Sequence, residues 1–168
     1  MEAKETNRTR DMLSEWCKLG IGFLLTQKRC ECPDVNPRCC VGGWQVCMDC
    51  SRFTNRAEGN YSPTEGEMLA VQDSLKRTKY FTLGCDKLVM GTDHKPLLGL
   101  INSRAMEEID NPRLIRLKAK TLGWRFKVIY VPGKFNGGPN CMSRYGFSQN
   151  KVPANKMYIG MCSDEDVT

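Results

Sequence analysis

Runs of apolar and β-branched residues dominate the first third of the chain. The segment 12–28 predicts two strands that separate near Gly20 and Gly22, and the alternating segment 43–50 predicts a third strand. A loop rich in cysteine, proline and glycine connects the second and third of these strands. Three strands at such close spacing predict an antiparallel meander.

The period of the apolar residues then changes from that of strands to that of helices. Ser62, Pro63 and Glu65 form a helix start, with a capping residue, a proline at the first helical position and an acid three residues after the cap. We expect this helix to end by Gly84. Its predicted apolar face consists of Met68, Val71 and Leu75.

The remainder of the chain alternates between strand and helix. The predicted elements are a strand at 87–93, helices at 94–102 and 111–123, a strand at 124–133 and one or two helical turns at 140–145. The element order is therefore β-β-β-α-β-α-α-β-α. This order predicts an α/β fold in which helices pack on a mixed sheet.

Composition and charge indicate a single packed domain that could bind a polyanion. A chain of 168 residues with 40% apolar residues suits one domain with a packed core. A net charge of +6 is compatible with a polyanionic partner. The N-terminal segment is charged, and no run is long enough to span a membrane, so we expect an intracellular protein of the cytoplasm or nucleus that is not secreted.

Ten cysteines in a chain without an export signal indicate free thiols or metal ligands. Four thiolates can complete a tetrahedral Zn²⁺ site. Neighbouring side chains diverge, which argues against a site shared by Cys39 and Cys40, and Cys47 and Cys50 are alternatives. Structural zinc and a set of reduced thiols therefore both stay open. The four candidate ligands lie within eleven residues of the loop between the second and third strands: Cys30, Cys32, Cys39 and Cys40.

Five stretches stand in order along the chain: GIGFLLTQK, SRFTNRAEGNYSPTEGEMLAV, YFTLGCDKLVMGTDHKPLLGL, NPRLIRLKAKTLGWRFKVIYVPGK and MSRY. Together they resemble the ribonuclease H-like domain of reverse transcriptases from gypsy-type LTR retrotransposons. The resemblance implies the ribonuclease H-like α/β fold, a five-stranded mixed sheet with three antiparallel strands first and flanking helices. We expect a domain at 1–145, with a Cys-rich loop insertion at 28–43, and a poorly ordered tail at 146–168.

The resemblance implies hydrolysis of the RNA strand of RNA/DNA hybrids at two Mg²⁺ or Mn²⁺ ions held by four carboxylates. By position, the helix carboxylate is Glu67 and the carboxylate at the end of the fourth strand is Asp93. The other two positions hold Glu15 and Asn140, where the family has Asp. The candidate catalytic residues are these four, and Glu15, Glu67 and Asp93 are the candidate metal ligands.

The two departures predict impaired cleavage. Glu15 adds a methylene, and displacing a catalytic group by about 1 Å can cost roughly a hundredfold in rate. Asn140 loses the charge and so weakens the hold on a second ion. Asp11 lies on the same strand face as Glu15, but four strand residues span about 13 Å, too far for it to substitute.

Asp93 and His94 also have simpler interpretations. An Asp between a strand and a helix commonly caps the helix, and Asp93 could do this as well as bind metal. His94 could contact metal-bound water or a substrate phosphate. Because Mg²⁺ rarely recruits imidazole, we expect His94 to be a partly buried residue that caps the helix.

Basic residues offer contacts to the phosphates of nucleic acid. Arg113, Arg116 and Lys120 fall at helical spacing and share one face, although a solvated helix face explains the same pattern. The partners implied by the resemblance are an RNA/DNA hybrid or other nucleic acid and an upstream polymerase domain of the same polyprotein. The candidate contacts are Arg52, Arg113, Arg116, Lys120 and Lys134.

Two functions from different classes fit these observations. One is a retrotransposon-derived ribonuclease H-like domain with impaired cleavage. The other is a non-catalytic module that keeps the fold and binds nucleic acid or protein. A polyprotein fragment, a domesticated gene and a decayed copy are all compatible with the sequence.

Overall fold

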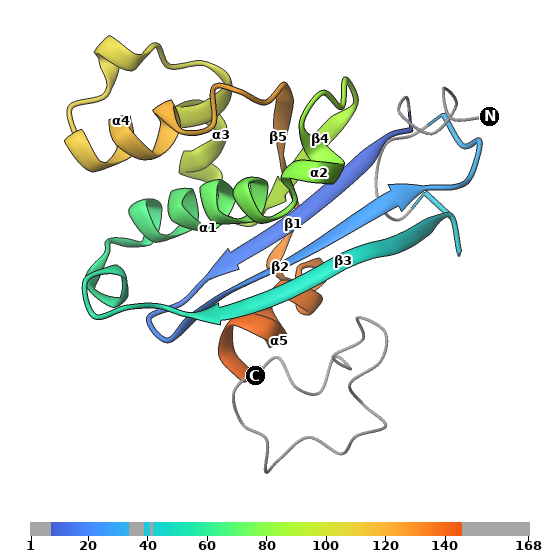
Figure 1. Ribbon diagram of the computed structural model, residues 1–168, viewed down its shortest axis with the longest axis horizontal. Coiled ribbons are helices and arrows are strands. Elements are labelled where there is room, and N and C mark those ends of the chain that lie inside the picture. The colour runs from blue at the N-terminus through green and yellow to red at the C-terminus, as the bar shows by residue number, and fades with distance from the viewer. Residues whose placement is uncertain (1–7, 34–38, 41, 146–168) are drawn as a thin grey trace.

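Five strands form one mixed sheet in the order β3-β2-β1-β4-β5 (Figure 1). The computed structural model describes residues 8–33, 39–40 and 42–145. β1, β2 and β3 pair antiparallel, β4 pairs parallel with β1, and β5 pairs parallel with β4. The predicted α/β fold, with three antiparallel strands first in a mixed sheet, is confirmed. The strands are β1 Arg10–Trp16, β2 Gly20–Lys28, β3 Trp44–Phe53, β4 Leu88–Thr92 and β5 Phe126–Tyr130.

Helices cover both faces of this sheet. α1 contacts β1 on one face, where α4 packs beside it, and α5 lies on the other face against β2 and β1 (Figure 1). Short 3-10 turns precede α1, α4 and α5. The helices are α1 Pro63–Arg77, α2 Lys79–Thr82, α3 Lys95–Asn102, α4 Pro112–Ala119 and α5 Gly137–Tyr145.

α1 begins where its sequence predicts. The Ser62 hydroxyl accepts a hydrogen bond from the Glu65 backbone N–H, and the Glu65 carboxylate accepts one from the Ser62 backbone N–H at 2.9 Å. The predicted apolar face is buried. The helix ends at Arg77, well before Gly84, because the chain turns at Thr78 into the short α2. Gly84 instead follows α2, with φ at +80°.

The hydrophobic core lies between α1 and the sheet. Met12 and Trp16 on β1 face α1, whereas Leu13 and Glu15 alternate to the face that α5 covers. Gly66 lets α1 approach β1 closely, because a Cβ at this position would lie 2.1 Å from the Trp16 ring. This contact fixes the first turns of α1 beside the end of β1.

The other predicted elements are present with shifted ends. The segments 94–102, 111–123, 124–133 and 140–145 correspond to α3, α4, β5 and the second half of α5. The predicted tail at 146–168 lies outside the described residues. Within the part of the chain that the structure covers, no helix has both the length and the hydropathy that crossing a membrane requires.

Candidate functional site

Glu15 and Asp93 lie at the carboxyl ends of two neighbouring parallel strands. The register pairs Leu13 of β1 with Gly91 of β4, so two further residues along each chain bring Glu15 level with Asp93. The turn after β5 closes over this edge, since a Cβ on Gly133 would lie 3.0 Å from Oδ2 of Asp93. Carboxyl ends of parallel strands are where open α/β sheets bind ligands.

α1 brings a third carboxylate to the same place. Oε1 of Glu67 accepts a hydrogen bond from the backbone N–H of Trp16 at 3.3 Å. One carboxylate oxygen from each of Glu15, Glu67 and Asp93 lies within 4.8 Å of the other two. Glu15 and Glu67 are buried, and Asp93 is partly exposed. The structure thus brings together the three residues predicted as metal ligands, which we call the carboxylate group.

Burial and mutual repulsion raise the pKa values within the carboxylate group. Burial, followed by the charge of Asp93, raises the pKa of Glu15 to about 7, against the opposing effects of Arg144 and Asn136. Burial, followed by the charge of Glu15, raises the pKa of Glu67 to about 9. The ionised carboxylate group therefore carries more negative charge than its surroundings compensate.

A hard divalent cation fits this donor set. Mg²⁺ and Mn²⁺ prefer carboxylate oxygens, together with water and phosphate oxygens. Oε2 of Glu67 is buried and has no hydrogen-bond partner among the described residues, so it is available as a ligand. Three converging carboxylates, one of which has a buried oxygen available as a ligand, match the chemistry of a divalent-metal site.

Two residues that the sequence prediction missed adjoin the carboxylate group. The fully buried Asn136 donates a hydrogen bond from Nδ2 to Oε2 of Glu15 at 2.9 Å. The charge of Arg144 on α5 lowers the pKa values of both Glu15 and Glu67. The available signal for Asn136 was a polar residue just after a strand and a Pro-Gly turn. Arg144 gave no such signal, because its position depends on how α5 packs on the sheet.

The fourth predicted position is Asn140, and Asp11 was the substitute rejected for its distance along β1. Asn140 lies within α5, but its side chain lies outside the described part of the structure, so its role stays a prediction. Asp11 is buried on β1, and in the described ranges its two carboxylate oxygens have no hydrogen-bond partner. Burial raises the pKa of Asp11 to about 7.

His94 begins α3 but does not cap it with its side chain. It occupies the N-cap position without a side-chain capping hydrogen bond, and Asp93, one residue earlier, is not the cap either. The His94 ring instead places Nε2 at 2.9 Å from the hydroxyl of Thr64 on α1. Burial lowers the pKa of His94, against the opposing charge of Asp93. The prediction of a partly buried histidine at the cap position of this helix is confirmed, although its side chain makes no capping hydrogen bond.

Two of the predicted phosphate contacts are already paired with carboxylates. Arg52 forms ion pairs with Glu58 at 2.8 Å and Asp73 at 3.1 Å. Arg113 forms an ion pair with Glu65 at 3.0 Å, and its guanidinium lies over the ring of Tyr61 at 4.3 Å from the centroid. These partners account for both charges within the fold, which weakens the case for a direct role in binding nucleic acid.

The other three predicted contacts are exposed. Arg116 lies on α4, and Lys120 directly follows that helix. Lys134 lies in the turn after β5, next to Gly133, which contacts Asp93. The Lys134 ammonium lies over the ring of Phe135, 4.8 Å from its centroid, so its contact with phosphate stays a prediction.

The four predicted zinc ligands also come together, at a different place. Their Sγ atoms all lie within 4.8 Å of one another in the loop between β2 and β3. The expectation that adjacent Cys39 and Cys40 diverge is wrong, because both thiols enter this cluster. The alternatives Cys47 and Cys50 lie on β3, outside the cluster as far as the described residues extend.

Comparison with known proteins gives concordant matches. Residues 8–122 match the family model described as the RNase H-like domain found in reverse transcriptase. The chain is 35% identical over 94 residues to the retrovirus-related Pol polyprotein from transposon opus of Drosophila melanogaster, covering 56% of this chain. It is 31% identical over 138 residues to the transposon Tf2-3 polyprotein of Schizosaccharomyces pombe, covering 80% of this chain. The matched part is 9% of each polyprotein.

Solved structures with low sequence identity share the fold. RNase H1 from the halophilic archaeon Halobacterium salinarum superposes with a TM-score of 0.54 at 10% identity, covering 81% of this chain and 93% of that one. A foamy viral protease-reverse transcriptase in complex with an RNA/DNA hybrid gives a TM-score of 0.51 at 11% identity, covering 95% of this chain and 18% of that one. The mixed sheet with flanking helices is thus the ribonuclease H-like fold.

Proposed function

The chain belongs to the family of RNase H-like domains found in reverse transcriptases, and we propose on this premise that it binds RNA/DNA hybrids and hydrolyses the RNA strand. The observation that carries the proposal is the convergence of Glu15, Glu67 and Asp93 within 4.8 Å. The family depends in general on divalent metal ions, which is the chemistry that this donor set suits. The relative solved with an RNA/DNA hybrid supports the choice of substrate.

The surrounding residues prepare the carboxylate group for this reaction. Mg²⁺ or Mn²⁺ bound there supplies an activated water, a stabilised leaving oxygen and neutralisation of the phosphate charge. Asn136 holds Glu15 at 2.9 Å, and the Trp16 backbone N–H holds Glu67 at 3.3 Å, so both carboxylates keep a fixed orientation. Arg144 lowers the pKa values of both and so favours their ionised forms.

The identities of residues 15 and 140 set the expected level of activity. Glu15 is buried and held by Asn136, so its extra methylene is confined within a packed site. Asn140 is neutral where the family has Asp, which leaves three ionisable ligands. Cleavage should therefore be slower than in a domain with Asp at both positions.

A non-catalytic binding module is the second candidate. The neutral Asn140 favours a binding module, because the loss of one carboxylate weakens the binding of a second metal ion more than it lowers the stability of the fold. Exposed Arg116, Lys120 and Lys134 would still bind phosphates in such a module.

A larger protein is the proposed setting for either activity. The polyprotein relatives are far longer than this chain, which spans 9% of each. An upstream polymerase domain in the same polyprotein is therefore the proposed partner, and the cytoplasm or nucleus is the proposed location.

Hydrolysis of an end-labelled RNA/DNA hybrid in Mg²⁺ or Mn²⁺ tests the proposal. We expect slow cleavage by the chain, no cleavage by Glu67→Gln, and unchanged cleavage by the exposed control Glu107→Gln. The double variant Glu15→Asp with Asn140→Asp should raise the rate roughly 10- to 100-fold. If every folded variant, including the double one, binds the hybrid without cutting it, the binding module is the correct reading and the nuclease proposal is wrong.

A further inference from the structure

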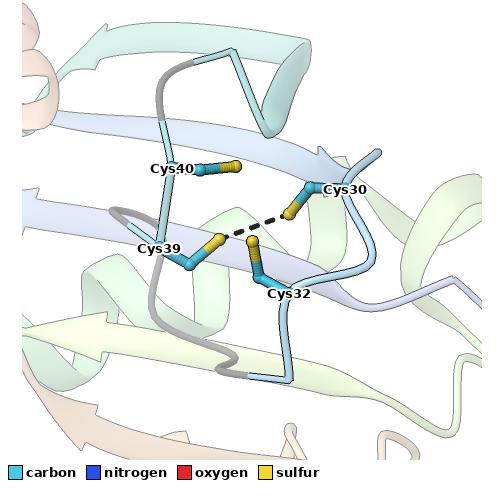
Figure 2. Close-up of side chains that lie close together, drawn as sticks. All are labelled: Cys30, Cys32, Cys39 and Cys40. Atoms are coloured by element: carbon cyan, nitrogen blue, oxygen red, sulfur yellow. Dashed lines mark hydrogen bonds between the residues drawn. The ribbon is translucent and has the colours of Figure 1, made fainter.

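Four thiols converge at the base of the loop that joins β2 to β3 (Figure 2). Cys30 and Cys32 follow β2, whereas Cys39 and Cys40 precede β3. In Figure 2 the four Sγ atoms point from the two arms of the loop into the space between them. Each Sγ lies within 4.8 Å of the other three, and those of Cys30 and Cys39 are 3.3 Å apart.

These separations match a single tetrahedral ion. Zn–S bonds of about 2.3 Å in tetrahedral geometry place the sulfur atoms about 3.8 Å apart. The Cys30–Cys39 distance of 3.3 Å is somewhat shorter than that value, and no pair of the four sulfur atoms is more than 4.8 Å apart. A disulfide needs sulfur atoms only about 2.05 Å apart. Thiolates are soft ligands, which select Zn²⁺ over Mg²⁺ or Mn²⁺.

The residues around the cluster favour negatively charged sulfur and close packing. Nε1 of Trp44 donates a hydrogen bond to Sγ of Cys39 at 3.3 Å, a contact that orients a metal-bound thiolate. The Lys28 ammonium donates to the carbonyl oxygen of Cys32 and so brings a positive charge to the cluster. A Cβ at Gly43 would lie 2.4 Å from Sγ of Cys40 and 2.8 Å from Sγ of Cys30, so a side chain there would displace these thiols.

The loop has little else in its sequence that could order it. Apart from cysteine, proline and glycine, the sequence between Lys28 and Trp44 contains only two apolar residues, Val35 and Val41. The backbone closes the base of the loop through a 2.7 Å hydrogen bond from the Arg29 N–H to the Gly43 carbonyl. A metal that cross-links the two arms would order a loop whose sequence offers so few apolar side chains.

We propose that Cys30, Cys32, Cys39 and Cys40 form a structural Zn²⁺ site that fixes the loop between β2 and β3. Four protein ligands close the coordination sphere, so the ion has no open position for substrate. The site is independent of the carboxylate group, because Glu15 pairs with Gly22 near the start of β2 and the loop leaves the sheet after Lys28 at its end.

Elemental analysis of the full chain, purified under reducing conditions and desalted, tests the proposal. We expect one equivalent of zinc per chain, lost in Cys32→Ser and in Cys39→Ser. Two controls should retain zinc: Cys47→Ser on exposed β3, and Glu67→Gln in the carboxylate group. Replacement of zinc by Co²⁺ should give the thiolate charge-transfer and tetrahedral visible bands in the native chain and both controls, and not in the two cluster variants.

A variant of a surrounding residue provides a second readout. Trp44→Phe should keep the zinc stoichiometry but weaken affinity roughly 10- to 100-fold, as measured by competition with a chelating dye. Circular dichroism checks that each variant folds. If the cysteine variants do not fold, the Co²⁺ spectrum of the native chain still shows whether four thiolates bind one ion.

Several outcomes overturn the assignment. They are the absence of stoichiometric zinc in the native chain, zinc retained by Cys32→Ser, equal loss of zinc in Cys47→Ser, stoichiometric iron in place of zinc, and a Cys30–Cys39 disulfide under reducing conditions.

Discussion

At the scale of single residues, the surrounding side chains only partly compensate the negative charge of the ionised carboxylate group. Asn136 and the Trp16 N–H each stabilise one carboxylate, and Arg144 adds a positive charge from α5. Burial, followed by repulsion among the carboxylates, raises the pKa of Glu15 to about 7 and that of Glu67 to about 9. Protons and divalent cations therefore compete for the same oxygens, with protons favoured at acidic pH.

Asn136 should contribute measurably to stability. Asn136→Ala removes the donor to Oε2 of buried Glu15, so we expect a loss of roughly 1–3 kcal/mol in the free energy of unfolding. Urea denaturation without divalent metal measures this loss. An unchanged free energy of unfolding would show that the hydrogen bond between Asn136 and Glu15 does not form in solution.

Asp11 should make stability depend on pH. Its pKa is 3.8 in its ordinary state and about 7 when buried in the fold, so between these values the folded chain holds a proton that the unfolded chain has lost. The stability that this protonated group contributes is complete below pH 3.8 and is lost as the pH rises through about 7.

Asp11→Asn should remove that dependence. At pH 8 the substitution should stabilise the chain by roughly 2–4 kcal/mol, because a buried charge without a hydrogen-bond partner in the described ranges becomes a neutral amide. The gain should be smaller at pH 5. Thermal or urea unfolding at the two pH values measures the difference, and an equal effect at both would contradict the raised pKa of Asp11.

At the scale of elements, local sequence signals predict where helices start better than they predict which residues meet in the tertiary structure. The capping box at Ser62 involves residues three apart, so the sequence contains all of it. The hydrogen bond between Asn136 and Glu15 joins residues 121 apart, and no local pattern announces it. The convergence of Glu15 with Asp93 needs the parallel pairing of β1 with β4, which the family resemblance implied and the strand pattern alone does not.

The two arms of the cysteine loop illustrate the same limit. Divergence of adjacent side chains is a sound rule for a regular strand. Cys39 and Cys40 lie before β3 in irregular backbone, where both thiols turn to the same side (Figure 2). Spacing alone therefore identifies the candidate ligands without deciding whether they meet.

Two helical glycines should respond oppositely to alanine. Gly66→Ala places a Cβ 2.1 Å from the Trp16 ring, so we expect a loss of about 1–3 kcal/mol in the free energy of unfolding. Gly99→Ala in α3 has nothing within 4 Å of the added Cβ and should gain about 0.5–1 kcal/mol from helix propensity. Paired urea denaturation curves measure both, and stabilisation by Gly66→Ala would contradict the packing of α1 on β1.

At the scale of the whole molecule, the two candidate metal sites lie towards opposite ends of β2. The carboxylate group has oxygen ligands and a partly exposed Asp93, whereas the cysteine cluster has four sulfur ligands at the base of a loop. Hard and soft ligands thus select different ions for the two sites. This separation lets one site be disrupted while the other serves as a control.

The exposed cations should govern binding to nucleic acid. Arg116→Ala and Lys120→Ala should each weaken binding to an RNA/DNA hybrid and reduce the salt slope of the affinity by about 1. Arg52→Ala should instead lower stability, because it leaves Glu58 without its ion-pair partner and removes one of the two arginines that pair with Asp73. Fluorescence anisotropy at several salt concentrations measures the slopes. A larger loss of affinity from Arg52→Ala than from Lys120→Ala would contradict this division of roles.

Calorimetric titration of Mn²⁺ into the zinc-saturated full chain tests whether Glu15, Glu67 and Asp93 bind a divalent cation. We predict saturable binding that strengthens from pH 6 to pH 8 and releases protons, because the ion displaces protons from carboxyls whose pKa values reach about 7 and about 9. Glu67→Gln and Asp93→Asn should each abolish most of this binding, and Glu107→Gln should leave it unchanged. Equal Mn²⁺ binding by Glu67→Gln and Glu107→Gln, or no saturable binding by the native chain at pH 8, would show that the carboxylate group is not a divalent-metal site.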